Sequence, residues 1–196
     1  VRVKYHLEAE HYISYNRLIG NRKKIYDIGC GLGYLDFLLH YSATDRQIVG
    51  IDADEEKILT ASNGLYNQEQ LSFVKSDVVD FAYESADVFI INDLLHYLSH
   101  QQQEILLSKV IEKLNPNGLL IIREGIKDGK GAENTRRTEI WSSKILKFNT
   151  VENNMAFLSD EFFTQLSLEN GLTLEKYSHS TTTSNHLFVF TKNGAE

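Results

Sequence analysis

A glycine-rich turn is the part of this chain whose residue types and spacing point most directly to chemistry. In IYDIGCGLG, residues 25–33, an apolar run reaches Asp27, and glycines then occupy alternate positions: Gly29, Gly31 and Gly33. Glycines in a turn allow the backbone to approach a ligand closely. Three of them behind a strand-end acid favour a ligand site over a mere tight connection.

Two common phosphate-binding motifs do not fit this turn. The dinucleotide fingerprint G-x-G-x-x-G requires glycine at a sixth position where Tyr34 or Asp36 stands, and no Gly-Lys-Ser/Thr of a P-loop follows. A pyrophosphate suits a bare helix N-terminus. The carboxylate of Asp27 would repel a pyrophosphate and favours a ligand that carries an ammonium or sulfonium group.

Polar residues also follow the next three expected strands, and the carboxyl ends of parallel strands meet at one crevice. Asp52, with Ala53 beside it, can accept both hydroxyls of a ribose, although NAD sites use an acidic residue in the same way. Asp77 can accept from an adenine amino group while the Val78 N–H donates to a ring nitrogen. The remaining residues expected to bind the cofactor are Cys30, Ser76, Asn92, Asp93 and Leu94.

Two further residues are candidates for proton transfer. His96 follows the fourth expected strand and either acts as a general base beside a substrate or packs as a helix residue under the loop. Glu124, at the end of the fifth strand, either points into the same crevice or forms an ion pair with Arg123. A single cysteine cannot build a metal site alone, and we expect no metal.

Strand and helix signals alternate along the chain, which predicts a sheet covered on both faces. The expected strands are 24–28, 47–52, 71–77, 86–93, 118–124, 172–180 and 186–192. The expected helices cover 4–19 and begin near Leu32, Asp54, Ser99 and Ser159. The short turn TTTSN makes the last two strands an antiparallel hairpin. The predicted fold class is α/β, a doubly wound, seven-stranded, mostly parallel sheet with an antiparallel last strand.

A polar stretch over residues 125–158 interrupts this alternation. From Arg123 to Thr150 there are seven basic and four acidic residues, in a chain of net charge −7. Such a basic, aromatic segment suits a lid over a substrate with an acidic group and an apolar body, and a solvated loop is the alternative. The residues expected to contact substrate are Arg123, Arg136, Arg137 and Trp141. We expect one domain over 1–196: a leading helix (1–22), a cofactor-binding half (23–124), this insert (125–158), and a last helix with the C-terminal hairpin (159–196).

Taken together, these motifs resemble those of the class I S-adenosylmethionine-dependent methyltransferases. The resemblance covers residues 25–125 and rests on five motifs in order: DIGCGLG, VGIDAD, SFVKSDVVDF, DVFIINDLLHYL and LNPNGLLIIREG. It implies S-adenosylmethionine as cofactor, a molecule with the ammonium and sulfonium groups that Asp27 favours. It also implies cofactor contacts, from the turn through the ribose and adenine to the reactive end, at Gly29, Gly31, Gly33, Asp52, Asp77, Val78, Asn92 and Leu94. A leading helix often closes over the cofactor in this family, which makes Tyr5 a candidate contact.

The function implied is methyl transfer to a small-molecule or lipid-like acceptor, with oxygen as the expected acceptor atom. Amino-group methylating relatives often carry Asn-Pro-Pro-Tyr after the fourth strand, where this chain has Asn-Asp-Leu-Leu at residues 92–95. Two other classes stay open: a NAD-dependent oxidoreductase and a catalytically silent binding module of the same fold. The acidic net charge argues against nucleic acid as partner. The sequence does not determine the oligomeric state.

A narrower resemblance concerns the later part of the chain. The stretches NTRRTEIWSSKILKFN, MAFLSDEF and TTTSN resemble the methyltransferase portion of bacterial proteins that fuse an exporter, a lysophospholipid acyltransferase and a methyltransferase. The missing initiator methionine agrees with a piece of such a chain, and a lipid or aryl-polyene-type acyl chain would then be the acceptor. No apolar run approaches the ~18 residues of a membrane span. We expect a cytoplasmic protein, at the cytoplasmic face of a membrane if it is part of a longer chain.

Overall fold

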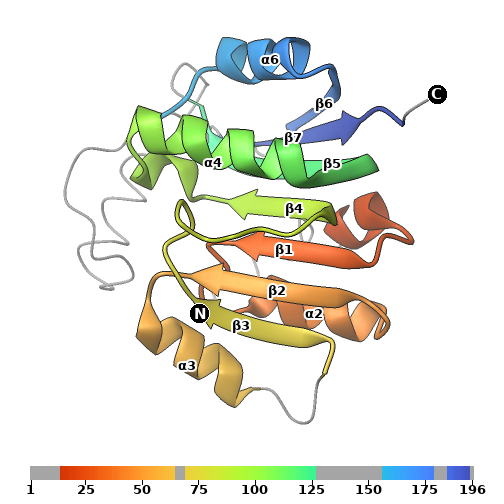
Figure 1. Ribbon diagram of the computed structural model, residues 1–196, viewed down its shortest axis with the longest axis vertical. Helices are drawn as coiled ribbons and strands as arrows, with labels where there is room; N and C mark the ends of the chain where they lie inside the picture. Colours follow the sequence, from red (N-terminus) through yellow and green to blue (C-terminus); the bar gives the residue numbers. More distant parts are fainter. Residues whose placement is uncertain (1–13, 65–68, 127–155, 179–184, 195–196) are drawn as a thin grey trace.

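The computed structural model describes residues 14–64, 69–126, 156–178 and 185–194. These residues build a seven-stranded sheet in the order β3-β2-β1-β4-β5-β7-β6 (Figure 1). The strands are β1 (Lys24–Ile28), β2 (Gln47–Asp52), β3 (Leu71–Lys75), β4 (Ala86–Asn92), β5 (Leu114–Gly125), β6 (Leu172–Ser178) and β7 (Asn185–Lys192). The pairs from β3 across to β5 are parallel, whereas β7 runs antiparallel to both β5 and β6. The predicted fold class is confirmed.

The strand order reverses at the centre of the sheet. From β1 the chain moves outward to β2 and β3 and then returns to β4, on the other side of β1. The carboxyl ends of these parallel strands share one edge, at the left in Figure 1. Ligands of open parallel sheets bind outside such ends, where the strand order reverses. The glycine turn, which directly follows β1, therefore stands at the expected position for a site.

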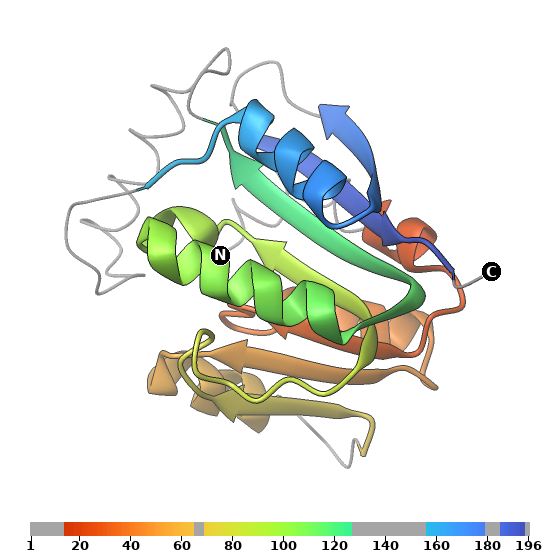
Figure 2. The ribbon, with the colours of Figure 1, turned by 45° about the horizontal axis from the view of Figure 1, so that its top comes forward.

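Helices cover both faces of the sheet. They are α2 (Tyr34–Ser42), α3 (Glu55–Asn63), α4 (His100–Lys113) and α6 (Asp160–Glu169), with the 3-10 turn η1 (Leu95–Tyr97) and a further helical segment at 14–19. Figures 1 and 2 show α4 in front of the sheet and α2 behind it. None of the helices within the described residues has the length and apolarity needed to cross a bilayer.

Alternate strand residues supply two hydrophobic cores, one on each face. In β1, Ile25 joins the core beneath α2 and the 14–19 helix, while Tyr26 joins the core beneath α4 and α6. The same alternation continues in β4, where Phe89 and Ile90 face opposite cores. Both faces are buried, so the strands contain nearly continuous apolar runs.

The structure corrects two predicted boundaries. β5 begins at Leu114 and not at 118, because NPNG is a bulge inside the strand: the register with β4 shifts between Ala86 and Val88, and Asn117 has a φ of 61°. α2 begins at Tyr34, later than predicted, because Gly33 has a left-handed conformation and is its N-cap. The predictions for residues 4–13 and for most of the 125–158 insert lie outside the described residues.

Candidate functional site

The glycine turn passes from β1 over the end of β2. The backbone N–H groups of Gly29 and Cys30 both donate to the Ile51 carbonyl oxygen, at 2.8 and 3.0 Å. The three glycines have φ angles of 80°, 57° and 72°, in the order of the chain. L-residues with a side chain rarely adopt such angles. The path of the backbone therefore requires glycine at all three positions.

The surroundings of the three glycines differ, which assigns them different tasks. A Cβ on Gly33 would stand 2.4 Å from the Phe73 ring, so this glycine allows α2 to begin against β3. A Cβ on Gly29 would stand 3.1 Å from the Leu94 side chain. A Cβ on Gly31 would meet no atom of the described residues within 4 Å. Gly31 is thus the glycine that faces open space, and Gly33 supplies close helix–strand packing.

Asp52 connects the glycine turn to the start of α3. Its Oδ2 accepts from the Gly31 N–H at 2.9 Å, and its Oδ1 accepts from the Asp54 N–H at 2.9 Å. Ala53 is exposed between the two acids. Each carboxylate oxygen has two lone pairs, so each oxygen of Asp52 can accept one more donor. The half-buried carboxylate beside Gly31 is therefore able to accept two ribose hydroxyls.

The residues predicted to contact adenine lie next to Asp52. The Ser76 N–H donates to the Asp52 carbonyl oxygen at 3.0 Å. Asp77 Oδ1 accepts from the Val79 N–H at 2.8 Å, which orients this carboxylate in a local turn. The Val78 side chain is buried in the core beneath α4. The ends of β2 and β3 thus bring the predicted ribose and adenine contacts together.

Two buried carboxyl groups lie behind the turn. Asp27, in β1, is 3% exposed, and Asp36, in the first turn of α2, is 0% exposed. The two groups interact, and each shifts the pKa of the other. Burial raises the pKa of Asp27 to about 7; the interaction with Asp36 opposes this rise and the charge of Asp52 adds to it. Burial, followed by the charge of Asp27, raises the pKa of Asp36 well above its usual range.

The electrostatic character of this region is strongly acidic. No basic group among the described residues contributes to the pKa of Asp27 or Asp36. Burial, followed by the charges of three aspartates, also raises the pKa of the Cys30 thiol. A thiol that stays protonated is a poor nucleophile, so Cys30 is better suited to a small residue of the turn than to nucleophilic catalysis.

The end of β4 is held by two neighbouring elements. The buried Tyr15 hydroxyl, from the 14–19 helix, donates to Asn92 Oδ1. Asp93 leaves the strand with a φ of 49°, and its N–H donates to the Arg123 carbonyl oxygen at 2.9 Å. The carboxylate of Asp93 forms an ion pair with the Arg123 guanidinium. Arg123, predicted to contact substrate, is therefore held against a residue predicted to contact the cofactor.

Tyr15 is a site neighbour that the sequence analysis missed. The helix expected over residues 4–19 was assigned no site residue near its end, whereas Tyr15 and Ile19 are both fully buried there. Their spacing of four residues is the signal that was available. Nothing in the sequence indicated that the tyrosine would reach Asn92.

His96, in η1, and Glu124, near the end of β5, form a buried pair. His96 Nδ1 lies 2.5 Å from Glu124 Oε1, and the two side chains are 2% and 1% exposed. Glu124 Oε1 also accepts from the Gly125 N–H at 3.0 Å. The predicted alternative of an ion pair with Arg123 is wrong, because successive strand residues face opposite sides of the sheet. With the Nδ1 proton donated to Glu124, the lone pair of the neutral imidazole lies on Nε2.

A short segment, residues 156–158, covers this pair. The Phe157 ring stacks on His96 with centroids 5.2 Å apart, and the Ala156 N–H donates to the His96 carbonyl oxygen at 2.9 Å. Gln103, 1% exposed on α4, donates from Nε2 to the carbonyl oxygens of Leu95 and Ala156, at 2.8 and 2.7 Å. Gln103 therefore links residues 156–158 to η1 by hydrogen bonds, a role that the sequence did not indicate.

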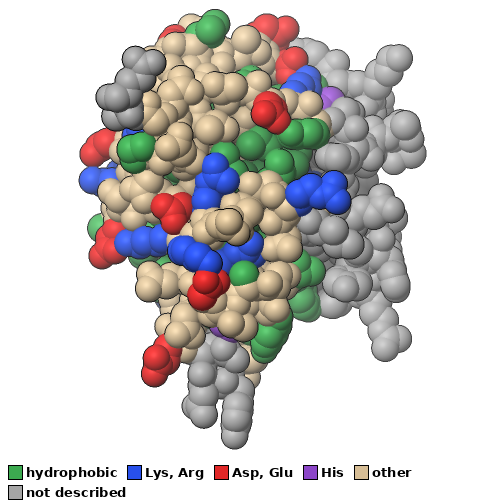
Figure 3. Space-filling model, turned by 90° about the vertical axis from the view of Figure 1, so that its right-hand side faces the viewer, with side chains coloured by type: hydrophobic (Ala, Val, Ile, Leu, Met, Phe, Trp, Pro, Cys, Tyr) green, Lys and Arg blue, Asp and Glu red, His purple; other side chains and the backbone are tan. Residues whose placement is uncertain are grey.

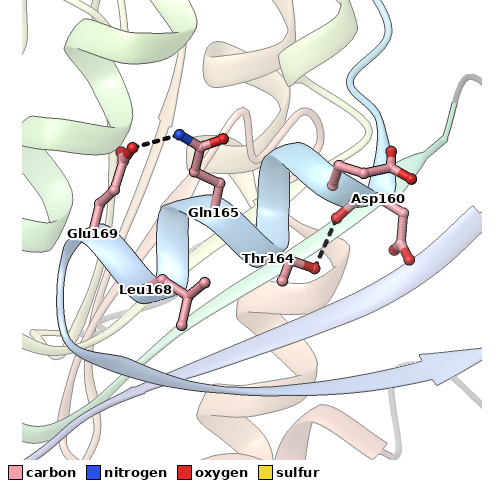
Figure 4. Close-up of a pocket in the computed structure, with 6 residues that line it drawn as sticks. Asp160, Thr164, Gln165, Leu168 and Glu169 are labelled. Carbon is pink, nitrogen blue, oxygen red and sulfur yellow. Dashed lines mark hydrogen bonds between the residues drawn. The ribbon is translucent and has the colours of Figure 1, made fainter.

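Other surfaces carry less chemistry. A shallow pocket on α6 is lined by side chains of that helix alone, with Gln165 donating to Glu169 (Figure 4). At the opposite edge of the sheet from the glycine turn, basic and acidic side chains are mixed (Figure 3), and they include the ion pairs Lys23–Asp45 and Lys24–Glu84. The described residues contain no group of three or more His, Cys, Asp or Glu placed to hold a metal. Tyr5, Arg136, Arg137 and Trp141 lie outside the described residues.

The family follows from a match over most of the chain. A family model described as "Methyltransferase domain" matches residues 19–174, and the chain therefore belongs to this family. The resemblance to the class I S-adenosylmethionine-dependent methyltransferases is confirmed. The family assignment makes the chain a transferase and does not support the NAD-dependent oxidoreductase that the sequence left open.

The relatives and solved structures agree with this assignment. Carboxy-S-adenosyl-L-methionine synthase from Shewanella oneidensis is 26% identical over 117 residues, which are 57% of this chain and 48% of that protein. The chain thus spans about half the length of the curated relatives it matches. Magnesium protoporphyrin IX methyltransferase from Synechocystis with bound S-adenosylhomocysteine has a TM-score of 0.72 at 15% identity, over 98% of this chain and 85% of that one. N-methyltransferase NodS from Bradyrhizobium japonicum, also with S-adenosylhomocysteine, has 0.69 at 19% identity, over 94% and 87%. At these identities the solved structures show the shared fold.

Proposed function

We propose that this domain binds S-adenosylmethionine at the carboxyl ends of β1 to β4 and methylates an oxygen of a small-molecule or lipid-like acceptor. The observation that carries the proposal is the set of three acidic side chains around an open glycine turn, Asp27, Asp36 and Asp52, none of which has a basic partner among the described residues. Such a site repels phosphates and suits a cationic ligand. The residues present therefore fit the cofactor of the family.

The proposed cofactor contacts follow the strand ends. Asp27 faces the ammonium group, and the backbone at Gly31 lies along the open side of the turn. Asp52 accepts the ribose hydroxyls with the lone pairs that its two backbone donors leave over. Asp77 and Val78 hold the adenine. The cofactor supplies an electrophilic methyl group bound to a sulfonium. Transfer of that methyl group to the acceptor would leave a neutral thioether.

The protein's main contribution to such a transfer is position. Aligning nucleophile, methyl carbon and sulfur supplies about 7–11 kcal/mol of the barrier reduction. Tyr15 and Arg123 hold Asn92 and Asp93 at the end of β4, where the reactive end of the cofactor is proposed to lie. A rigid strand end of this kind keeps the acceptor and donor in line.

His96 and Glu124 are the proposed proton acceptors. Glu124 orients the imidazole through Nδ1 and stabilises its protonated form, so that Nε2 can take the proton of an acceptor hydroxyl. A positioned base typically contributes about 10²–10⁴-fold in rate. A phenol or a carboxylate acceptor would depend on it less than an aliphatic hydroxyl.

The acceptor is proposed to carry an acidic group on an apolar body. Arg136, Arg137 and Trp141 of the basic insert are the proposed contacts, together with Arg123 beside Asp93. Basic and aromatic side chains of this kind suit a lipid-like acceptor or an acyl chain with an acidic group. The relatives named carboxy-S-adenosyl-L-methionine synthase match over about half their length, and their activity is not carried over to this chain.

Calorimetric titration with S-adenosylhomocysteine, with NAD as the control ligand, tests the proposal first. We expect binding of the former alone, at least a tenfold loss of affinity in Asp52→Asn, and no change in the exposed control variant Asp45→Asn. Acceptors are then screened with S-adenosylmethionine, starting with phenols and lipid-like hydroxyls. Binding of S-adenosylhomocysteine without transfer to any acceptor would support the silent-module alternative, and binding of NAD would overturn the cofactor assignment.

A further inference from the structure

The loop between β3 and β4, residues 76–85, contains the two residues proposed to hold the adenine, Asp77 and Val78. Hydrogen bonds from within the loop fix its backbone at both residues. The Asp77 carbonyl oxygen accepts from the Phe81 N–H at 3.0 Å, and the Val78 carbonyl oxygen accepts from the Tyr83 hydroxyl at 2.8 Å. Loops are usually more mobile than the elements they connect. Here two successive peptide groups have a fixed orientation.

The orientation of these peptide groups determines what the loop presents to a ligand. In a trans peptide the C=O and the N–H point in opposite directions. The peptide between Val78 and Val79 directs its C=O at the Tyr83 hydroxyl, and its N–H donates to Asp77 Oδ1 at 2.8 Å. The peptide between Asp77 and Val78 directs its C=O at the Phe81 N–H. The Val78 N–H therefore points away from Phe81, and it donates to no acceptor in the described part of the chain.

An acceptor and a donor on consecutive residues are thus left for a ligand. The exposed Asp77 uses Oδ1 for the Val79 N–H, while its Oδ2 has no donor among the described residues. Adenine offers the complementary pattern on its Watson–Crick edge, where an amino donor stands next to the N1 acceptor. Hypoxanthine has a carbonyl oxygen and an N1–H at the same two places, so its pattern is inverted. The loop as held in the structure therefore suits adenine and not hypoxanthine.

The Tyr83 side chain is itself fixed by packing in the core. Its buried ring makes edge-to-face contacts with three aromatic rings, and the centroids of Tyr26, Phe81 and Phe89 lie 5.6, 4.9 and 5.8 Å away. Tyr26 belongs to β1 and Phe89 to β4, so the centre of the sheet holds the phenol in place. Burial, followed by the charge of Asp77, raises the pKa of the Tyr83 phenol, which keeps its hydroxyl a donor.

We propose that Tyr83 is a positioning residue for recognition of the cofactor base, acting through the Val78–Val79 peptide on the Asp77 carboxylate. This inference rests on the proposed function and adds the residue that sets its preference for adenine. Without the hydroxyl the peptide loses its anchor, and the carboxylate and the neighbouring N–H lose their common orientation. Lys109 of α4 supports the same loop, because its Nζ donates to the Val79 carbonyl oxygen at 2.5 Å.

The experiment compares the calorimetric affinities for S-adenosylhomocysteine and for S-inosylhomocysteine, in which hypoxanthine replaces adenine. We expect the wild-type chain to prefer the adenine compound by about tenfold or more, because hypoxanthine leaves a donor and an acceptor unpaired. In Tyr83→Phe, which keeps the ring, we expect affinity for S-adenosylhomocysteine to fall about 3–10-fold. Affinity for the analogue changes less, because the loop no longer imposes the pattern that it mismatches, so the ratio of the two affinities narrows.

A matched control separates this effect from the mere loss of a hydroxyl. Tyr177→Phe also removes a phenol hydrogen bond, to Glu175 on β6, at the far side of the sheet from β3. We expect this variant to keep the wild-type ratio. A general loss of folded protein lowers both affinities equally and leaves the ratio unchanged, so the ratio reports positioning and not stability.

The outcomes distinguish this inference from the proposed function. An unchanged ratio in Tyr83→Phe overturns the role of Tyr83 and leaves the cofactor assignment standing. Equal affinities of the wild-type chain for the two compounds overturn base recognition by the loop without any variant. If Tyr83→Phe does not fold, Lys109→Met takes its place: a narrowed ratio supports the inference and an unchanged one overturns it. Absence of S-adenosylhomocysteine binding by the wild-type chain overturns the proposed function, and this inference with it.

Discussion

His96 Nδ1 lies 2.5 Å from Glu124 Oε1, in a pair that η1 and β5 bring together from 28 residues apart and that Phe157 covers. The carboxylate of Glu124 has no other charged partner among the described residues. A buried carboxylate in this position stabilises an imidazolium and fixes the orientation of the ring. The two side chains therefore act as a unit.

Replacement of Glu124 by Gln tests this unit. The amide oxygen can still accept from His96 Nδ1, but the charge that stabilises the imidazolium is lost. We expect kcat to fall about 10–100-fold, up to the lower limit of what a general base contributes, because the amide keeps the hydrogen bond, while affinity for S-adenosylhomocysteine stays unchanged. Steady-state kinetics and calorimetry measure the two effects. The matched control is Glu112→Gln on the exposed face of α4, and an unaltered kcat in Glu124→Gln with an aliphatic hydroxyl acceptor would falsify the assignment.

Alanine at three glycines separates backbone strain, steric contact and ligand binding. Gly20, Gly31 and Gly33 all have positive φ, yet only a Cβ on Gly33 would collide with a ring, at 2.4 Å from Phe73. We expect Gly20→Ala and Gly31→Ala to lower the free energy of unfolding by about 1–2 kcal/mol, and Gly33→Ala by clearly more.

Affinity for S-adenosylhomocysteine distinguishes the two milder variants. Gly31 faces the open space of the turn and Gly20 lies at the end of the 14–19 helix, so only Gly31→Ala is expected to weaken binding, by tenfold or more. Thermal unfolding and calorimetry on the same samples measure both properties. Equal affinities in the two variants would contradict the placement of the ligand along Gly31.

Replacement of Gln103 by leucine, a side chain of similar volume, tests the hydrogen bonds that link residues 156–158 to η1. Gln103→Leu removes the donor for the carbonyl oxygens of Leu95 and Ala156, and buried acceptors without donors cost about 1–3 kcal/mol each. We expect lower stability and a reduced kcat, because residues 156–158 no longer hold Phe157 against His96. The exposed Gln101 on the same helix provides the control variant Gln101→Leu. Wild-type kcat in Gln103→Leu would show that the covering segment has no role in catalysis.

Much of this arrangement could be predicted from the sequence because it depends on local signals. Each of these signals can be recognised from a few consecutive residues: the helix caps Asp54 and Ser99, the apolar runs of the strands, and the glycine turn. The order of strand ends then places Asp52 and Asp77 together, since parallel strands present their carboxyl ends at one edge. These inferences needed no knowledge of side-chain packing.

The remaining contacts join residues far apart in the chain, and no short pattern encodes them. Tyr15 donates a hydrogen bond to Asn92, which is 77 residues further along the chain. Glu124 pairs with His96 and not with Arg123, its neighbour in the sequence. Asp36 stood in the sequence only as the residue that breaks the dinucleotide fingerprint. The position of Asp36 relative to Asp27 depends on how α2 packs against β1. The hydrophobic periodicity of the sequence does not predict that packing.

The link between Tyr15 and Asn92 predicts a modest stability effect and a specific kinetic one. Tyr15→Phe keeps the buried ring and removes the hydroxyl that donates to Asn92 Oδ1. We expect a loss of about 1 kcal/mol in the free energy of unfolding and a lower kcat, because Asn92 is no longer fixed at the end of β4. The exposed Tyr41→Phe is the control. A stability loss with an unaltered kcat would assign Tyr15 a purely structural role.

The buried aspartates predict how stability depends on pH in the ligand-free chain. The folded-state pKa of Asp27, about 7, lies above its unfolded value of 3.8, because burial disfavours the charge. The folded state therefore binds this proton more tightly, and the stabilisation is fully present below about pH 4 and is lost as the pH rises to about 7. A shift of about three units corresponds to about 4 kcal/mol.

Other carboxylates titrate over the same range, so the difference between variants is the informative quantity. The free energy of unfolding of Asp27→Asn, minus that of the wild-type chain, is expected to grow as the pH rises from 4 to 7, because only the wild type loses the stabilisation. For Asp45 the pH dependence has the opposite sign. Its hydrogen bond to Lys23 lowers its pKa, so Asp45→Asn is expected to lower the free energy of unfolding at pH values above the acid range. Denaturant unfolding at pH 4.5, 6 and 7.5 measures both. A difference between Asp27→Asn and wild type that does not change with pH would contradict the raised pKa of Asp27, because a carboxyl group that ionised normally would leave no proton to lose in this window.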